Sequence, residues 1–201
     1  MAGPPTRPAL RARYDRRQDD VARVAARVFA QRGYDRTSVQ ELTDEIGLAA
    51  GGLYHYFPSK ERLLIRICSQ LVDPLLESAR ELLEPDSESE QHLRSLVRLW
   101  VGQVIEYRDN MLVFQQERHI IERGEQFREI RWRRKEFERL VDDALARVEE
   151  DHPELRWERR IAVSALLGMV NYTAQWYRPR GRLTPLQIAD GYVDLLLSPP
   201  R

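Results

Sequence analysis

Hydrophobic residues recur every three or four positions along almost the whole chain, which is the period of an amphipathic helix. In one stretch, for example, Leu93, Leu96 and Trp100 fall on a single helical face. No segment shows the convincing two-residue alternation of a half-buried strand. The pattern therefore predicts an all-α protein of about nine helices. They are expected over residues 14–32, 38–46, 49–56, 60–83, 91–107, 111–121, 125–150, 157–177 and from 184 onward.

Breakers separate these segments. Gly124 and the acidic stretch 85–90 are expected to be turns, and Asp109–Asn110 interrupts the pattern between two helices. Pro74 stands inside the fourth helix, where it removes a backbone hydrogen bond and should kink or break the helix. The last helix opens with Thr184-Pro185-x-Gln187, which combines an N-cap, a proline at the first position and a capping-box glutamine.

The segment from residue 37 to 64 has the plan of a helix, a glycine turn and a second helix. Ser38 and Glu41 form the Ser-x-x-Glu capping box that begins a helix. Gly47 ends that helix, where a residue tolerant of positive φ is needed. A second short helix follows over 49–56. This arrangement is typical of proteins that place the second helix in the DNA major groove.

The residues of this region resemble the TetR family of bacterial transcriptional regulators. The resemblance implies a helix-turn-helix DNA-binding domain over residues 13–60 and an effector-binding and dimerisation domain over 61–201, after a disordered basic arm over 1–12. It is carried by Phe29, Gly33, Tyr34, Thr37, Ser38, Val39, Ile46, Gly47, Gly51, Leu53-Tyr54-His55-Tyr56-Phe57, Ser59-Lys60 and Leu63-Leu64.

In that family the second helix of the motif reads the major groove and its neighbours hold phosphates. Hydroxyl, imidazole and ammonium groups at a helix start suit phosphate oxygens. Tyr54, His55 and Lys60 match the family's phosphate contacts, and Ser38, or Thr37 beside it, matches the contact at the helix start. The resemblance together with these chemistries gives the expected DNA-binding residues Thr37, Ser38, Gln40, Thr43, Ala49, Ala50, Gly51, Gly52, Tyr54, His55 and Lys60.

The chain departs from the family where Ala49, Ala50 and Gly52 replace longer polar residues. Two explanations stay open. The small side chains can let the backbone approach the bases, with methyl groups against thymine. Alternatively, Gln40, Thr43 and Tyr54 read the bases together with an arm bearing Arg7, Arg11 and Arg13 in the minor groove. A third interpretation is a helical interaction protein that has lost DNA binding.

The distribution of charge supports the two explanations in which the chain binds DNA. The net charge is zero, yet residues 1–36 hold nine arginines against four aspartates. The basic excess therefore coincides with the segment that resembles the DNA reader, and the rest of the chain is acidic.

Composition argues against other classes. The lone Cys68 excludes an intrachain disulfide and fits the reducing cytoplasm. No stretch resembles a spanning helix or a signal peptide, so no membrane partner is expected. The four histidines are scattered without metal-ligand spacing, and GLAAGG lacks the Lys-Ser/Thr ending of a phosphate loop. We therefore expect no enzyme activity, no metal and no cofactor. The histidines are His55, His92, His119 and His152.

The resemblance implies that the last two helices form a twofold dimer and that the middle domain encloses an apolar effector pocket. Ile161, Ala165, Met169, Leu195 and Leu196 suit the dimer interface. The expected effector-binding residues are Trp100, Tyr107, Phe114, Trp132, Asn171, Tyr172 and Trp176.

The segment from Gly168 to Leu197 resembles TetR-family regulators of fatty-acid, steroid and acyl-CoA metabolism, through its Trp-Tyr-x-Pro-x-Gly turn. The effector implied is an acyl-CoA, whose phosphates Arg178, Arg180 and Arg182 can contact. An alternative effector is a lipophilic drug or cation, for which Glu106 and Glu117 are available.

The implied partners are thus an operator duplex, a second copy of the chain and a small lipophilic effector. The effector can release the DNA only by preferring the conformation whose recognition helices are wrongly spaced. Repression is the expected sign because most of the family represses. Pro74 is a candidate hinge in the fourth helix.

Overall fold

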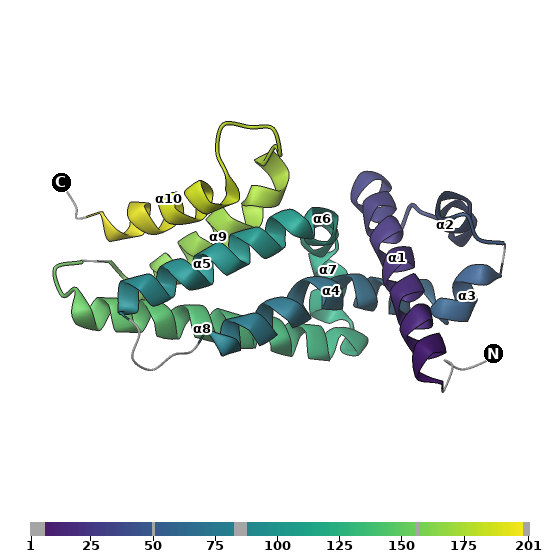
Figure 1. Cartoon of the computed structure of the whole chain (residues 1–201), viewed down its shortest axis with the longest axis horizontal. Coiled ribbons are helices and arrows are strands. Elements are labelled where there is room, and N and C mark those ends of the chain that lie inside the picture. Colours follow the sequence, from purple (N-terminus) through teal and green to yellow (C-terminus); the bar gives the residue numbers. More distant parts are fainter. Residues whose placement is uncertain (1–6, 50, 83–87, 156, 199–201) are drawn as a thin grey trace.

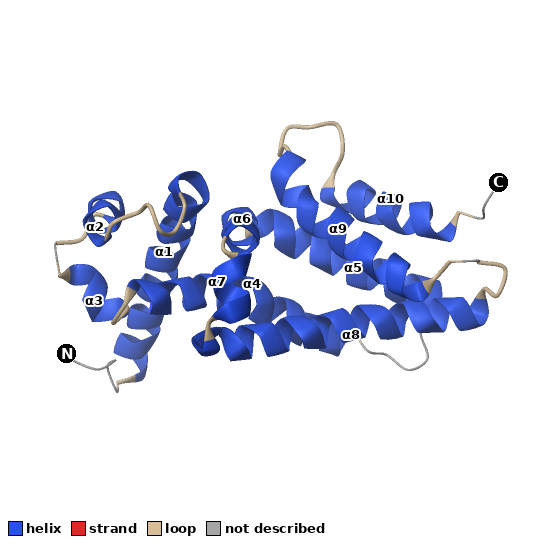
Figure 2. Cartoon of the chain, turned by 180° about the vertical axis from the view of Figure 1, so that it is seen from behind, coloured by secondary structure: helices blue, strands red, loops and turns tan. Residues whose placement is uncertain are grey.

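The computed structural model describes residues 7–49, 51–82, 88–155 and 157–198. These parts consist of helices and loops without a strand, as Figure 2 shows, which confirms the predicted all-α class. The helices are α1 (Pro8–Arg32), α2 (Val39–Ile46), α3 (Gly52–Tyr56), α4 (Lys60–Glu81), α5 (Ser89–Glu106), α6 (Arg108–Gln116), α7 (Arg118–Arg123), α8 (Arg128–Asp151), α9 (Arg159–Trp176) and α10 (Pro185–Leu197), with a 3₁₀ turn over Glu125–Phe127.

The molecule is elongated, with α1, α2 and α3 at one end and α5, α8, α9 and α10 at the other (Figure 1). The helix α4 runs from the first group into the second, and α6 lies between them. Among the described helices none is long and apolar enough to cross a membrane.

The helix caps form as predicted. Ser38 Oγ accepts a hydrogen bond from the Glu41 backbone N–H at 3.2 Å, and the Glu41 carboxylate accepts one from the Ser38 N–H at 2.7 Å. The bonds that the Glu41 carboxylate accepts from the Ser38 N–H and hydroxyl lower the pKa of Glu41 below its ordinary value. Gly47 ends α2 in the left-handed region, at φ 72°. The Thr184–Gln187 capping box likewise begins α10. Both ends of α2 and the start of α10 are therefore fixed by local chemistry.

The start of α1 differs from the prediction of a disordered N-terminal arm. It begins at Pro8 rather than Tyr14, so the expected disorder over 1–12 is wrong for residues 8–12, while residues 1–6 lie outside the described part. Proline suits this position because a first-turn N–H has no partner within the helix. Arg11 and Arg13 consequently stand on an ordered helix.

The middle of the chain also differs from the prediction. The break after α5 falls at Tyr107, and Asp109–Asn110 begins α6 instead of interrupting the pattern. Asn110 donates from Nδ2 to the Ile67 carbonyl at 2.9 Å, so its side chain anchors α6 on α4. The single helix expected over 111–121 is divided at Glu117 into α6 and α7.

Two hydrophobic cores share α4. Its first half, including Leu64 and Ile67, packs with α1, α2 and α3. Its second half, including Leu71 and Leu75, packs with α5, α8, α9 and α10. The predicted domain boundary at residues 60/61 therefore falls at the start of α4. It does not divide the hydrophobic packing, because α4 is buried in both cores.

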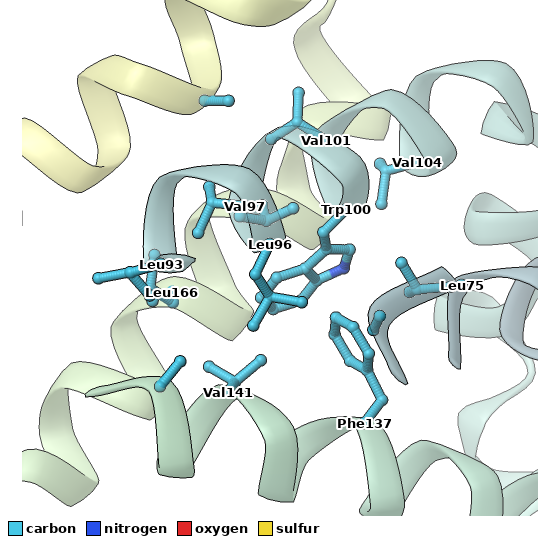
Figure 3. Close-up of a cluster of buried hydrophobic side chains, with 14 of the residues drawn as sticks. Leu75, Leu93, Leu96, Val97, Trp100, Val101, Val104, Phe137, Val141 and Leu166 are labelled. Carbon is cyan, nitrogen blue, oxygen red and sulfur yellow. The ribbon is translucent and has the colours of Figure 1, made fainter. Parts of the chain in front are cut away.

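Trp100 and Phe137 lie at the centre of the larger core. Their rings meet edge to face, with centroids 4.9 Å apart, as Figure 3 shows. Trp100 also donates from Nε1 to Asn171 Oδ1 at 3.2 Å. The indole thereby connects α5, α8 and α9 and satisfies its one polar atom inside the core.

Pro74 does not end α4, contrary to one of the two predicted effects. The helix continues to Glu81, although proline leaves the Gln70 carbonyl without its intrahelical donor. Gln103 on α5 supplies a replacement, since its Nε2 lies 3.4 Å from the Gln70 oxygen and 3.2 Å from that of Leu71. A polar side chain of α5 therefore replaces part of the hydrogen bonding that Pro74 removes from α4.

Candidate DNA-binding face and effector hollow

The helix-turn-helix exposes most of the predicted DNA-binding residues on one end of the molecule. Tyr54 and His55 on α3 are exposed, and so are Ser38 and Gln40 on α2. Gln40 donates from Nε2 to Asp44 Oδ1 at 2.8 Å, so its amide is held along the helix surface. The exposed atoms are hydroxyl, imidazole and amide groups, which suit phosphate and base edges.

Two of the predicted residues face inward instead. Thr37 is 1% exposed and donates its hydroxyl to the Gly33 carbonyl at 2.7 Å. Thr43 is also 1% exposed and donates to the Gln40 carbonyl at 2.8 Å. Both hydroxyls bond within the domain and both side chains are buried in the free chain, so their contact with DNA stays a prediction.

The recognition helix is shorter than expected, beginning at Gly52 rather than Ala49. Ala49 and Gly51 are exposed in the turn before it, and Ala50 lies outside the described residues. A Cβ placed on Gly52 would lie 3.2 Å from the Leu48 Cβ, so the tight approach of this turn favours glycine. The departure from the family pattern thus has a local packing reason at Gly52.

Lys60 is the first residue of α4, and its side chain lies over two aromatic rings. Its Nζ is 4.3 Å from the ring centroid of Tyr34 and 5.8 Å from that of Phe29. Desolvation lowers its pKa, against the opposing effect of Asp35, Glu117 and Glu41. The cation–π contact holds the ammonium group at one place near the start of the helix.

A hollow of about 480 Å³ lies between α6, α7, α8 and α9. We name it the effector hollow. Met111, Phe114 and Leu167 give it an apolar side, while Arg118 and Arg134 bring two guanidinium groups to it. Its remaining lining residues are Gln115, Glu138, Ser164, Gly168, Asn171, Tyr172 and Gln175.

Hydrogen bonds join the polar lining of the effector hollow across two helices. Gln115 on α6 donates from Nε2 to the Asn171 carbonyl at 2.9 Å. Gln175 on α9 donates to Gln115 Oε1 at 3.0 Å. Arg134 contacts Glu122 and Glu138, at 2.5 and 3.2 Å. A ligand in the hollow would therefore compete directly for the contacts between α6 and α9.

The structure brings together three of the seven predicted effector residues: Phe114, Asn171 and Tyr172 line the hollow. Trp100 does not, because it is buried in the core. Trp132 is on the outer surface of α8 with Arg80 6.0 Å from its ring, and Trp176 is exposed and lines no described hollow. Tyr107 lies between α5 and α6, away from the effector hollow.

Apart from Asn171, the prediction from sequence missed the polar and charged lining, because it was directed mainly at aromatic residues. A usable signal was present on α9. Ser164, Gly168, Asn171 and Gln175 recur at helical spacing and form a polar stripe on an otherwise apolar helix. Arg118 and Arg134 had no such signal, since arginines are abundant in this chain.

The other stripe of α9 is apolar and faces outward. Ile161 is 67% exposed, and Leu195 on α10 is 70% exposed. Ala165, Met169 and Leu196 are half-buried in the single chain. Leu183 and Leu186 are also exposed, and exposed apolar side chains in this number commonly mark a protein interface.

Comparisons with known proteins agree with this architecture. The HTH-type transcriptional repressor KstR2 of Rhodococcus jostii (strain RHA1) is 27% identical over 183 residues, which cover 90% of each chain. The crystal structure of PfmR from Thermus thermophilus superposes with a TM-score of 0.77 at 27% identity, covering 88% of this chain and 96% of that one. AibR in complex with isovaleryl coenzyme A and operator DNA has a TM-score of 0.75 at 28% identity, covering 91% and 99%.

Family models match both parts of the chain. Residues 22–67 match the bacterial regulatory proteins of the tetR family. Residues 86–199 match the tetracyclin repressor-like C-terminal domain. Since the second match alone spans more than half of the chain, the protein belongs to the TetR family of bacterial transcriptional regulators.

Proposed function

We propose that this chain is a homodimeric repressor that an acyl-CoA thioester releases from a palindromic operator. Family membership makes it a ligand-responsive DNA-binding regulator and not an enzyme. As a regulator of bacterial genes, it would act in the cytoplasm. The observation that carries the proposal is the effector hollow, whose lining helix α6 also contacts the DNA-binding domain.

The chemistry of the effector hollow favours a ligand with an apolar part and an anionic part. The apolar side formed by Met111, Phe114 and Leu167 suits an acyl chain. Arg118, which is 72% exposed, is at a solvent-facing side where a guanidinium can meet phosphate. The related AibR was crystallised with isovaleryl coenzyme A, which supports the thioester class.

The arginine turn after α9 contributes less than the sequence suggested. Arg178, Arg180 and Arg182 are exposed, and none of them lines the effector hollow. The proposal therefore assigns the anionic group of the effector to Arg118 and Arg134.

A lipophilic cation is the second candidate, and the lining argues against it. Glu138 is the one carboxylate among the lining residues, and it already contacts Arg134 at 3.2 Å. Glu117 points toward the DNA-binding domain, and Glu106 lines a different surface hollow. Among the lining residues, a cation would thus meet two guanidinium groups and one carboxylate.

The exposed apolar faces of α9 and α10 support the dimer. Two copies joined about a twofold axis would bury these faces and present two recognition helices to a palindrome. Half-sites one helical turn apart, about 34–36 Å, would then be read together. An effector that prefers a different spacing of the two α3 helices would release the DNA.

The test is binding of the purified protein to its own upstream DNA, with and without acyl-CoA thioesters, the free acids and lipophilic cations. Release by thioesters alone is expected. Release by cations alone would replace the acyl-CoA assignment with the second candidate. Absence of sequence-preferring binding would favour the helical interaction protein and contradict the repressor.

A plug variant sharpens the test. A Cβ on Gly168 would meet nothing within 4 Å, so the backbone accepts a side chain there, and Gly168→Leu is expected to fill part of the effector hollow that Gly168 lines. It is expected to bind the operator and to lose release by the thioester. The matched control is Gly102→Leu on α5, also in open space but outside the hollow, which should respond like wild type. Equal responses of both variants would contradict the assigned site.

A further inference from the structure

The first turns of α1 carry arginines that have no carboxylate partner among the described residues. Arg13, Arg16 and Arg17 are exposed, and no ion pair involves them in the part of the chain that the structure describes. Their neighbour Arg11 is different, because its Nε lies 3.0 Å from Asp15. The unpaired guanidinium groups are therefore free to meet an anion from outside.

Side-chain bonds fix this end of α1 against the recognition helix. Tyr14 donates its hydroxyl to the His55 carbonyl at 2.9 Å, and Gln18 donates from Nε2 to the Tyr56 carbonyl at 2.9 Å. The rings of Tyr14 and Tyr56 are 5.2 Å apart between centroids. The start of α1 is thus joined to the end of α3, and Figure 1 shows both helices at the same end of the molecule.

A hollow of about 560 Å³ lies in this surface, beside the end of α3. Its one carboxylate, Asp20, is already paired with Arg23 at 3.3 Å. Three guanidinium groups therefore dominate its charge. The lining residues are Leu10, Arg13, Tyr14, Arg16, Arg17, Asp20 and Tyr56.

We infer that this surface binds the phosphate backbone of DNA, as a second contact beside the recognition helix. The inference rests on the proposed operator binding. A polyanion fits because the arginines form a row along the helix, with Arg13 and Arg17 four residues apart on one face. Continuity with α3 favours the duplex that α3 reads over an unrelated anion.

This contact replaces the minor-groove arm that the sequence suggested. Arg13 stands on an ordered helix braced by Tyr14, and such a helix suits the outer backbone better than a narrow groove. It is also compatible with the small side chain of Ala49 before α3. Phosphate contacts supply affinity without sequence information, so a recognition helix with few base contacts can still be held on DNA.

The experiment compares Arg13→Gln/Arg17→Gln with Arg178→Gln/Arg182→Gln. The control pair makes the same charge change in the exposed turn after α9, outside the DNA-binding domain. Affinity for the operator and for a random duplex is measured across salt concentrations, and phosphate-ethylation interference identifies the phosphates each protein needs. Thermal unfolding verifies that all variants fold.

The first variant is expected to bind both duplexes roughly tenfold more weakly, with a log–log salt slope shallower by about two. Some phosphates that wild type and the control variant need for binding should no longer be needed by the Arg13→Gln/Arg17→Gln variant. An unchanged affinity and slope would overturn the inference while operator binding by wild type stands. Equal losses in both pairs would overturn it too, as a bulk charge effect. If wild type binds no duplex, the proposed function itself fails.

Discussion

The Glu117 carboxylate accepts a hydrogen bond from the backbone N–H of Tyr34 at 3.0 Å, across 83 positions of sequence. Glu117 is 6% exposed and ends α6, while Tyr34 lies in the turn after α1. Phe114 and Gln115 of the same helix line the effector hollow. A displacement of α6 by a ligand would therefore act on this bond and on the start of the helix-turn-helix.

We predict that Glu117→Ala destabilises the protein by about 1–3 kcal/mol, because the Tyr34 N–H would lose its acceptor. Urea unfolding measures this change. The variant should also respond less to the effector in operator binding. Glu117→Gln keeps an acceptor oxygen and should stay closer to wild type in both measurements. If Glu117→Ala keeps wild-type stability and response, the bond does not couple the two parts.

A second prediction concerns Pro74 and Gln103. Pro74→Ala restores an N–H that can bond to the Gln70 carbonyl, so the free energy of unfolding should rise, by up to about 3 kcal/mol. A stiffer α4 should require more effector for the same release of DNA. Unchanged operator affinity and unchanged effector response would reject Pro74 as a hinge.

Gln103→Leu is the companion variant. It removes the donor to the Gln70 and Leu71 carbonyls while Pro74 is still present in α4. It should lower the free energy of unfolding by about 1–3 kcal/mol by leaving carbonyls unsatisfied. In the Pro74→Ala background the same substitution should cost less, because the Gln70 carbonyl then has its own helical donor. Equal costs in both backgrounds would show that Gln103 does not compensate for the proline.

Local signals predicted the parts of the fold that local chemistry determines. The capping boxes at Ser38 and Thr184 and the left-handed Gly47 formed as predicted, because their partners lie within a few residues. The start of α1 at Pro8 was missed because a proline-rich start without an apolar stripe looks unstructured. That helix is instead held by long-range bonds from Tyr14 and Gln18 to α3.

The site was less predictable for the same reason. Phe114, Asn171 and Tyr172 were predicted and line the effector hollow, yet aromatic character alone could not separate Phe114 and Tyr172 from Trp100, which is buried in the core. Thr37 and Thr43 carry hydroxyl groups that suit DNA, but their bonds to backbone carbonyls turn them inward. Sequence spacing identifies a helix face, and only the packing of other helices decides what that face meets.

A third prediction is a pH dependence from His92, which is buried at the start of α5. Desolvation lowers its pKa below the ordinary 6.5, the charge of Arg147 lowers it further, and the Leu82 carbonyl opposes both. Below pH 6.5 the unfolded chain therefore takes up a proton that the folded protein resists. Stability should fall as the pH drops from about 7 toward 5.

The measurement is the free energy of unfolding against pH for wild type and His92→Asn. The variant should lose the part of the slope that this histidine contributes. His119→Asn removes an exposed histidine and should retain that part. A His92→Asn profile that runs parallel to wild type through this window would contradict the assignment.

The last prediction concerns the apolar faces of α9 and α10. Ile161→Arg and Leu195→Arg place a charge where the proposed twofold interface would exclude water, so each should shift the protein toward monomers in sedimentation equilibrium. Affinity for the palindrome should then fall toward that for a single half-site. The control is Trp132→Arg on α8. Trp132 is 46% exposed and lies outside the proposed interface, so this variant should remain dimeric. Dimers that survive both interface substitutions would place the interface on another face, and the twofold reading of the operator would need another pair of helices.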